Sequence, residues 1–423
     1  MNQGKISFVT AVLICLNTIM GAGIFINAKP LTFLAGSFGF ISYPLCALLI
    51  LPVILSIAEL AKLHPVSGGL YVYSKMHLHP RIGFFAGWSY FLAKTTTSAL
   101  LVHCSTTFFQ TCIPALRVVP TLVLDYLIIG GLVTLNIFGV RVGGKAQYVT
   151  SAFKALPILF SFLCGFFVTP AHIAAFSDAA AIEPLTLIPV AIFAVVGFEI
   201  ICSIAGLLEK PERTIKPAIL TSFSIAVCVA TLFQFSLYRA LGPDLAQAST
   251  PLLTLGTTFF PAMPWIGQLF NGFVFASIFG GSFTILTSNC WNLHTLAKDN
   301  HLPFSNILTK LTAANTPWAS LIVEGILCCL IITISQQQAP LQNMSIFAHF
   351  ACYSLTSLAL LQAIRKGSVK QSIMVPLLSL ASCCYVFNLC LKNLITFGIS
   401  FSFVSIFIVG WVLSCFFGKK SSE

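Results

Sequence analysis

Long apolar runs, separated by short polar stretches, extend over almost the whole chain. A run of about 20 apolar residues is the length that an α-helix needs to cross the hydrocarbon core of a bilayer. The pattern therefore predicts an all-α, polytopic membrane protein with about twelve transmembrane helices. The predicted spans are residues 8–26, 40–60, 83–112, 118–138, 147–168, 185–207, 217–240, 265–296, 318–335, 344–364, 372–391 and 395–417.

The composition supports this class of protein. Hydrophobic residues make up 57% of the 423 residues and charged residues only 8%, whereas ordinary soluble domains carry about 25% charged residues. The net charge of +11 does not predict nucleic-acid binding, because the charges lie in short loops between apolar runs. The 15 cysteines include no CxxC pair and lie mostly within apolar runs. They predict no metal site, no cofactor and no disulfide framework.

The basic residues are distributed unequally between the two sides of the predicted spans. Of the 22 Lys and Arg residues, two lie within spans, four lie in loops on one side, and the remaining sixteen lie on the side that holds both termini. Cytoplasmic loops carry the excess of Lys and Arg. We therefore predict a multi-pass protein of the cytoplasmic (inner) membrane with both termini in the cytoplasm. The first span is expected to be retained and not removed as a signal peptide.

Glycines occur near the middle of two spans. Gly21 and Gly23 flank Ala22 in the first span, and Gly197 lies in the sixth. Glycine in a helix interior costs about 1 kcal/mol relative to alanine. Interrupted helices at corresponding positions are typical of inverted-repeat transporters, in which helix N-termini hold carboxylates and unwound carbonyls hold cations. A close helix–helix contact through small residues is the alternative interpretation.

Ionisable residues within spans are the best candidates for functional groups, because placing a charge there costs several kcal/mol. Glu199 lies in the sixth span, Lys154 in the fifth and Lys94 in the third. Each has a structural alternative: Glu199 as a buried neutral acid, Lys154 as a lysine that reaches the membrane surface, and Lys94 as the partner of an acid. Four further groups are interpreted as structural or interfacial: Asp125, Glu324, His103 and His349.

Five motifs in order resemble those of the amino acid–polyamine–organocation transporter family, over nearly the whole chain. A single match to such a motif is compatible with chance, whereas five matches in the family's order are not. The motifs are Asn17-Thr-Ile-Met-Gly-Ala-Gly-Ile-Phe25; residues 58–73 (AELAKLHPVSGGLYVY); residues 139–141 (GVR) with residues 154–157 (KALP); residues 193–199 (FAVVGFE) with residues 209–218 (EKPERTIKPA); and residues 296–303 (LAKDNHLP) with residues 315–317 (NTP).

The resemblance implies a particular fold. It implies ten core helices in two inverted five-helix repeats, with the first and sixth helices broken, and two peripheral helices. The repeats would comprise residues 1–168 and 169–366, and the peripheral helices with a short cytoplasmic tail would comprise residues 367–423. Transport would proceed by alternating access, with a bundle of helices rocking around a site at the bilayer midplane.

The resemblance also implies the positions of the substrate site and its gates. The break in the first span would take the carboxylate of an amino acid, and carbonyls of the sixth span would take its amino group. Lys154 would couple transport to protons or occupy the place of a sodium ion. The predicted substrate-binding residues are Thr18, Ile19, Gly21, Ala22, Gly23, Phe193, Ala194, Val196 and Gly197. The predicted gating residues are Tyr90, Phe193, Glu199 and Tyr353.

Departures from the family pattern leave the side chain of the substrate open. Ile285 falls near the position of an aromatic residue in the family's arginine/agmatine exchanger, and Trp291 is not in register with it. Ala22 stands where relatives often have serine, and residues 289–292 lack an arginine that often precedes the following loop. The predicted substrate is an amino acid or a related amine, carried by proton-coupled symport or by exchange. Exchange of an amino acid for its decarboxylated amine is an alternative, and a monomer and a homodimer both stay open.

Other classes of membrane protein fit the sequence less well. A membrane-embedded enzyme needs clustered catalytic groups or a metal, but the 11 acidic residues are scattered. A channel more often repeats a pore helix and a filter sequence around a symmetric oligomer, and neither is visible. A transporter with two parallel six-helix halves is the nearest rival, and interrupted spans five apart argue against it. We therefore predict a transporter and not an enzyme.

Overall fold

The computed structural model describes residues 6–66, 68–139, 144–167 and 184–417. These residues form helices and connecting turns. The described residues contain no strand, and their only β-type pairing is an isolated parallel bridge between Ile6 and Leu208. The helices up to residue 167 are α1 (Phe8–Ile19), α2 (Gly23–Ile26), α3 (Ala28–Ala35), η1 (Gly36–Ile41), α4 (Ser42–Leu63), α5 (Gly69–His77), α6 (Pro80–Cys112), η2 (Pro114–Val118), α7 (Thr121–Ile137), α8 (Gly144–Phe162) and the π-helical turn η3 (Leu163–Phe167).

The chain from residue 184 onward is also helical. Several of its helices begin at a proline, which lacks an N–H and suits the first turn of a helix. The helices of this part are α9 (Pro184–Phe193), α10 (Ile200–Ser203), η4 (Ala205–Leu207), α11 (Pro211–Leu241), η5 (Gly242–Ala246), α12 (Pro251–Phe259), α13 (Trp265–Lys298), α14 (Ser305–Leu308), α15 (Trp318–Ile334), α16 (Gln338–Arg365), α17 (Met374–Thr396) and α18 (Ser400–Phe417).

Many of these helices have the length and composition of membrane spans. Among the described residues, six helices or pairs of consecutive helices are long and apolar enough to cross a bilayer, and four apolar helices are shorter. The predicted class, an all-α polytopic membrane protein, is confirmed. The number of twelve spans stays a prediction, as does the division into two repeats, whose boundary after residue 168 lies outside the described residues. The six long candidates are Phe8–Ile26, Ala28–Leu63, Pro211–Ala246, Trp265–Lys298, Gln338–Arg365 and Met374–Thr396.

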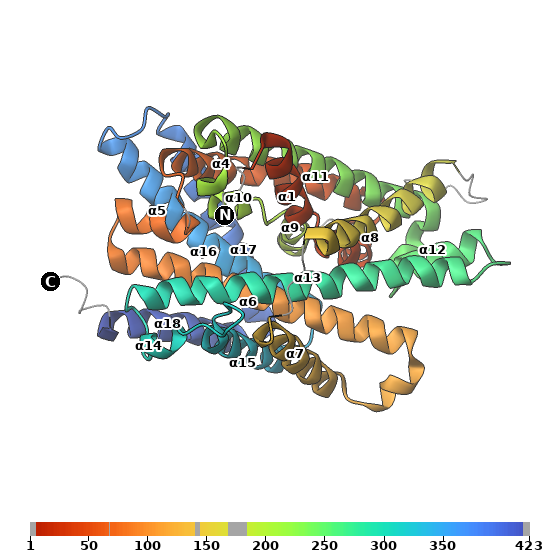
Figure 1. Cartoon of the computed structure of the whole chain (residues 1–423). Helices are drawn as coiled ribbons and strands as arrows, with labels where there is room; N and C mark the ends of the chain where they lie inside the picture. Colours follow the sequence, from red (N-terminus) through yellow and green to blue (C-terminus); the bar gives the residue numbers. More distant parts are fainter. Residues whose placement is uncertain (1–5, 67, 140–143, 168–183, 418–423) are drawn as a thin grey trace.

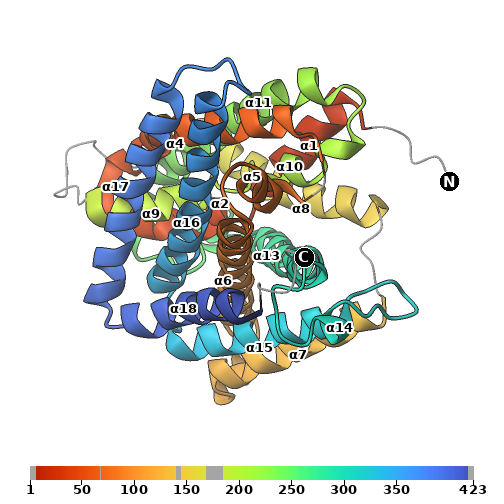
Figure 2. The same cartoon turned by 90° about the vertical axis from the view of Figure 1, so that its left-hand side faces the viewer.

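Two long helices, α6 and α13, run side by side through the middle of the molecule (Figure 1). Seen from their ends in Figure 2, they occupy the centre and the other helices surround them. Helix α16 packs against α6, and α8 packs against α13 and α11. The central pair therefore provides a fixed wall against which the interrupted segments of the chain lie.

The first span is not one continuous helix. Helix α1 ends at Ile19, and α2 begins at Gly23. The amide of Gly21 donates to the carbonyl oxygen of Ile19 at 2.7 Å and not to that of Asn17, which a continuing α-helix would use. The turn at residues 20–22 therefore releases the Asn17 carbonyl from the helical ladder.

The sixth span is interrupted in a similar way. Helix α9 ends at Phe193, and α10 begins at Ile200. Gly197, between them, has a φ of +123°, a conformation that only glycine adopts without strain. Its amide donates to Oε2 of Glu199 at 3.1 Å, so a side chain replaces the carbonyl that a helix would supply. Residues 194–199 thus cross the interior of the molecule as non-helical backbone.

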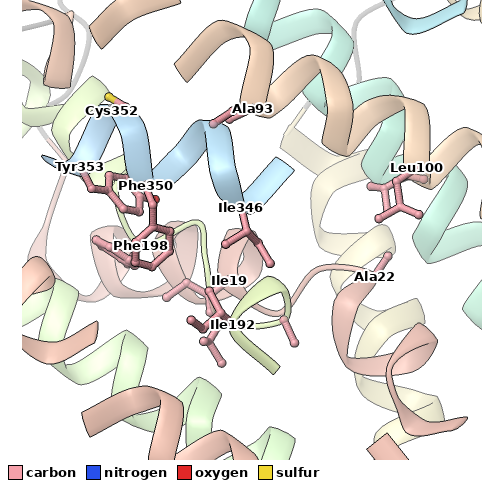
Figure 3. Packing of buried hydrophobic residues seen from close by; sticks show 14 of the residues in the cluster. Ile19, Ala22, Ala93, Leu100, Ile192, Phe198, Ile346, Phe350, Cys352 and Tyr353 are labelled. Atoms are coloured by element: carbon pink, nitrogen blue, oxygen red, sulfur yellow. The ribbon is translucent and has the colours of Figure 1, made fainter. Parts of the chain in front are cut away.

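A cluster of buried rings closes one end of this interior. The ring of Phe198 lies 5.6 Å from that of Tyr353, and Phe350 lies 5.5 Å from the same tyrosine. Figure 3 shows these three rings together, with Ile19 and Ile192 next to them. The cluster joins α16 to the interrupted part of the sixth span, so the non-helical backbone is held by packing on a rigid helix.

Candidate substrate site

A cavity of about 140 Å³ lies between the two interrupted segments and helices α6, α8, α13 and α16. Of the nine residues predicted to bind substrate, Ala194 does not line it, because it is buried against Gly23. The other eight line the cavity: Thr18, Ile19, Gly21, Ala22, Gly23, Phe193, Val196 and Gly197. The structure therefore brings the two glycine-containing segments together around one space.

The first interrupted segment presents hydrogen-bond donors. Residues 22 and 23 are buried, and within the described part of the chain the amides of Ala22, Gly23 and Ile24 donate no hydrogen bond. Amides in the first turn of a helix have no partner within the helix. Such a group of amides attracts negative charge, so this wall of the cavity suits a carboxylate.

The second interrupted segment presents acceptors. The carbonyl oxygens of residues 193–196 accept no hydrogen bond from other groups in the described ranges. Buried carbonyl groups without a donor cost free energy, and an ammonium group supplies three donors. The carbonyl wall and the amide wall therefore complement the two charged groups that every zwitterionic amino acid carries.

The two segments approach each other as closely as backbones can. A β-carbon built on Gly23 would lie 2.7 Å from the Cα of Ala194, and one on Gly197 would lie 3.2 Å from the carbonyl oxygen of Thr18. Glycine is required at residue 23 because any side chain there would meet the backbone of the other segment. The site is thus built from backbone on both sides.

Glu199 lies at the centre of a hydrogen-bond network beside the cavity. Its side chain is 1% exposed. Oε1 accepts from the hydroxyl of Tyr90 at 3.2 Å, and Oε2 accepts from the hydroxyl of Tyr353 at 3.0 Å. The predicted gating residues Tyr90, Glu199 and Tyr353 therefore meet, although Glu199 and the two tyrosines do not line the cavity itself.

The cation that completes this network is Lys94, for which the sequence allowed pairing with an acid but did not indicate which acid. Nζ of Lys94 lies 2.8 Å from Oε1 of Glu199, and it also lies 5.3 Å from the ring centroid of Tyr90, one helical turn earlier on α6. Lys94 lines the cavity together with His349, which the sequence analysis interpreted as structural. Lys94 was a candidate functional residue because its charge falls within an apolar run. The sequence did not show that Glu199 is its partner.

Lys154 also reaches the cavity wall. Its Nζ donates to the carbonyl oxygen of Asn17 at 3.0 Å and to Oδ1 of the same residue at 2.9 Å. The Asn17 carbonyl is the one released by the turn at residues 20–22, so the ammonium takes the place of the missing helical amide. Helix α8 packs mainly on α11 and α13, and Lys154 is its link to α1.

The remaining ionisable groups of the spans have partners elsewhere. Nδ1 of His103 lies 2.8 Å from Oδ2 of Asp125. Glu324 accepts from Nδ2 of Asn289 at 2.9 Å. Both pairs are buried away from the cavity, between helices α6, α7, α13 and α15. They are consistent with the structural role that the sequence analysis assigned to Asp125, Glu324 and His103.

Polar residues also gather at one end of the molecule, outside the spans. Asp299 contacts Nζ of Lys75 at 2.6 Å and the hydroxyl of Tyr71. Burial raises the pKa of Asp299, but the hydrogen bonds from these two donors outweigh it, and the pKa lies below its usual value. Nε2 of His64 lies 2.7 Å from Nε2 of His77, and burial lowers the pKa of both imidazoles.

The architecture is that of a multi-pass, all-α membrane protein with a cavity lined by backbone in its interior. A crystal structure of a mutant manganese transporter from Eremococcus coleocola is similar, with a TM-score of 0.62 at 13% sequence identity, over 96% of this chain and 93% of that one. At this identity the similarity concerns the fold alone. The family model of amino acid permeases matches residues 10–414. The chain belongs to the amino acid permease family.

Curated relatives cover most of the chain. An uncharacterized transporter of Mycobacterium tuberculosis is 26% identical over 399 residues, which are 90% of this chain and 84% of the relative. The serine/threonine exchanger of Bacillus subtilis is 24% identical over 390 residues, or 88% and 86% of the two chains. The lysine-specific permease of Lactococcus lactis is 24% identical over 340 residues, or 73% and 65%. These relatives are transporters and permeases and not enzymes.

Proposed function

We propose that this protein is a secondary active transporter that moves an amino acid across the cytoplasmic (inner) membrane by alternating access. The observation that carries this proposal is the pairing, across one cavity, of the amides of Ala22 and Gly23 with the carbonyls of Phe193 and Val196, none of which has a hydrogen-bond partner in the described ranges. The carboxylate of the substrate binds at Gly21, Ala22 and Gly23. Its amino group binds the carbonyls of the sixth span. Family membership and relatives named for serine, threonine and lysine support an amino acid substrate.

Phe193 and the Glu199 network serve as gates in this proposal. Phe193 lines the cavity at the last residue of α9, from where a small rotation of the non-helical segment moves its ring across the substrate. Glu199 accepts hydrogen bonds from Tyr90 of α6 and Tyr353 of α16, so this part of the sixth span stays bonded to both helices while the network is intact. Both termini are proposed to be cytoplasmic, because most of the Lys and Arg in the loops lie on their side.

Lys154 is proposed as the coupling residue. It occupies a position between α8 and the released Asn17 carbonyl, where a cation stabilises the turn at residues 20–22. In a proton-coupled symporter, loss of the proton from Lys154 frees this carbonyl and lets the first span change its packing. In an obligate exchanger, the ammonium keeps its charge throughout the cycle. The two mechanisms require different driving forces for net uptake.

Reconstitution into proteoliposomes tests the function and separates the two mechanisms. Each of the twenty amino acids is offered outside vesicles that are empty or preloaded with the same amino acid, with and without a pH gradient, in sodium-free buffer. We expect sodium-independent transport of at least one amino acid. Accumulation in empty vesicles under a pH gradient supports symport, whereas uptake only into preloaded vesicles supports exchange. Strict sodium dependence, or transport of no amino acid, would contradict the proposal.

A variant of Lys154 tests the coupling role in the same vesicles. Lys154→Ala is expected to abolish accumulation driven by the pH gradient while leaving residual exchange. Lys392→Ala, which removes an exposed lysine of α17, is the matched control and is expected to behave as the wild type. Undiminished accumulation by Lys154→Ala would rule out the coupling role without affecting the amino acid site.

A further inference from the structure

Positive charges outnumber negative charges among the described residues that line the cavity. Two lysines, Lys94 and Lys154, line it, and among its described lining residues none is Asp or Glu. Within the described ranges, Lys154 donates to the backbone and side-chain oxygens of Asn17 and to no acid, and these oxygens carry no charge. Glu199, outside the lining, neutralises one of the two ammonium groups. Among the residues that the structure describes, one positive charge at the site, that of Lys154, is therefore left without an acid before any substrate enters.

A positively charged substrate side chain would need a carboxylate as its partner. Glu199 offers such a carboxylate, and Lys94 is the cation closest to it. It lies 2.8 Å from Glu199, and the lysine side chain is 14% exposed while that of the acid is 1% exposed. The other acceptor positions of the carboxylate are taken by Tyr90, Tyr353 and the Gly197 amide. Lys94 lines the cavity whereas Glu199 does not, so within the described part of the chain the lysine stands between this acid and the cavity and presents its own charge there.

The size of the cavity favours a compact substrate. Its volume of about 140 Å³ is similar to that of an engineered protein cavity of about 150 Å³ that holds benzene. The lining of α13 consists largely of small residues, among them Ser277, Gly280 and Gly281. Lys94 and Lys154 both line this space, so a cationic side chain bound in it would lie near one or both ammonium groups, and like charges repel.

We infer that Lys94 is a specificity-determining residue that excludes amino acids with cationic side chains, so that the substrate is a small amino acid with a neutral or anionic side chain. This inference rests on the proposed function, since it concerns the same cavity. The mechanism is electrostatic. Lys94 is paired with Glu199, and its charge adds to that of Lys154. The side chain of a lysine or arginine substrate would add a further positive charge and find no free carboxylate among the described residues.

Ligand-dependent thermal stabilisation of the purified protein tests this selectivity without requiring turnover, because a ligand that binds only the folded state raises the melting temperature. The ligands are L-serine, L-alanine, L-aspartate, L-lysine and L-arginine. The wild type is expected to be stabilised by at least one of the first three and not by the two cationic amino acids. Lys94→Gln is expected to bind lysine at least about 10-fold more tightly than the wild type does, since Glu199 becomes available.

Two further variants separate charge from space. Lys94→Arg keeps the positive charge and is expected to exclude lysine as the wild type does. The double variant Lys94→Gln/Glu199→Gln enlarges the cavity as much as the single variant but offers no carboxylate, so it is expected not to gain lysine binding. The double variant also removes both charges of the ion pair, so it leaves no unpaired charge in the network. It therefore keeps the test decisive if the single variant misfolds.

Each outcome of this panel decides the inference. Wild-type binding of lysine as tight as that of serine, alanine and aspartate would overturn it and leave the proposed amino acid transport intact. Equal gains of lysine binding by the single and the double variants would assign the exclusion to space and would also overturn it. If no amino acid stabilised the wild type or entered proteoliposomes, both this inference and the proposed function would fail.

Discussion

Gly23 and Ala194 touch through backbone alone: a β-carbon on Gly23 would lie 2.7 Å from the Cα of Ala194. This contact joins the first and sixth spans at the middle of the cavity wall. Because neither residue has a side chain that can move aside, the spacing of the two segments is fixed by the absence of a single methyl group. Changes at residue 23 therefore report directly on the geometry of the site.

Gly23→Ala is expected to reduce transport by at least about 10-fold, because overpacking of this kind costs about 1–3 kcal/mol and pushes the two segments apart. The measurement is the initial uptake rate per inserted protein. Gly272→Ala in α13 is the control, since nothing lies within 4 Å of a β-carbon there. Transport by Gly23→Ala at the rate of this control would show that the close contact is dispensable.

Glu199→Gln is expected to reduce the turnover rate more than Tyr353→Phe or Tyr90→Phe does. The glutamine leaves Lys94, whose side chain is mostly covered, without a carboxylate, and breaking one side of a buried ion pair costs about 3–5 kcal/mol. Each tyrosine variant removes one hydrogen bond to a charged group, worth about 1.5–3 kcal/mol. Uptake rates corrected for the amount of folded protein give the order. A tyrosine variant that impairs turnover more than Glu199→Gln would place the critical contact on the ring and not on the acid.

Asn27→Ala is expected to lower the melting temperature in detergent. Nδ2 of Asn27 donates to the carbonyl oxygen of Val190 at 2.5 Å, and Oδ1 accepts from Nε2 of Gln342 at 2.7 Å. The alanine leaves both partners buried without a bond, at a cost of about 1–3 kcal/mol. Asn306→Ala, at an exposed residue of α14, is the control. Equal melting temperatures for the two variants would mean that the Asn27 bridge contributes nothing to stability.

The stability of the protein is expected to fall as the pH decreases through the range in which imidazoles ordinarily titrate. The pKa values of His64 and His77 are lowered by burial, so the unfolded chain takes up protons before the folded one does, and protonation favours unfolding. Above that range the two imidazoles are neutral in both the folded and the unfolded chain, so they no longer make the stability depend on pH. Melting temperatures measured between pH 8 and pH 5 give the slope.

His77→Gln is expected to reduce that slope, because one of the imidazoles whose pKa is lowered by burial is removed. His79→Asn is the control, since His79 is exposed and caps α6 through its side chain, a role that asparagine also performs. If the slope were unchanged in His77→Gln but reduced in His79→Asn, the pH dependence would come from His79 and not from His77, and the prediction would be wrong.

Most of the fold was predictable from hydropathy, since long apolar runs have few alternatives in a bilayer. The predicted span of residues 40–60 corresponds to α4, and that of residues 372–391 corresponds to α17. The short helices α3 and α5 were not predicted. Helix α3 has eight residues, too few for a periodic pattern to be distinguished from loop sequence. Such elements are set by packing on the long helices and not by their own composition.

The candidate site was predictable where backbone chemistry requires a special residue. Gly23 and Gly197 mark the two interrupted segments, and Glu199 is conspicuous as an acid in an apolar run. The ion pair of Lys94 with Glu199 was not predictable, because its two residues are 105 positions apart and meet only through the crossing of α6 with the sixth span. The contribution of His349 was missed for a similar reason: a single polar residue in α16 resembles many others that pack between helices.

The pairing of Ile6 with the segment after the sixth span has a mechanical consequence. The amide of Ile6 donates to the carbonyl oxygen of Leu207 at 2.9 Å, and the amide of Glu209 donates to that of Ile6 at 3.1 Å. These bonds fasten the start of α1 to the chain that leaves α10, while Gly23 touches Ala194 deeper in the molecule. Contacts at two depths tie the two spans to each other on both sides of their interruptions. We therefore expect a displacement of either span to move the other, and with it the opposite wall of the cavity.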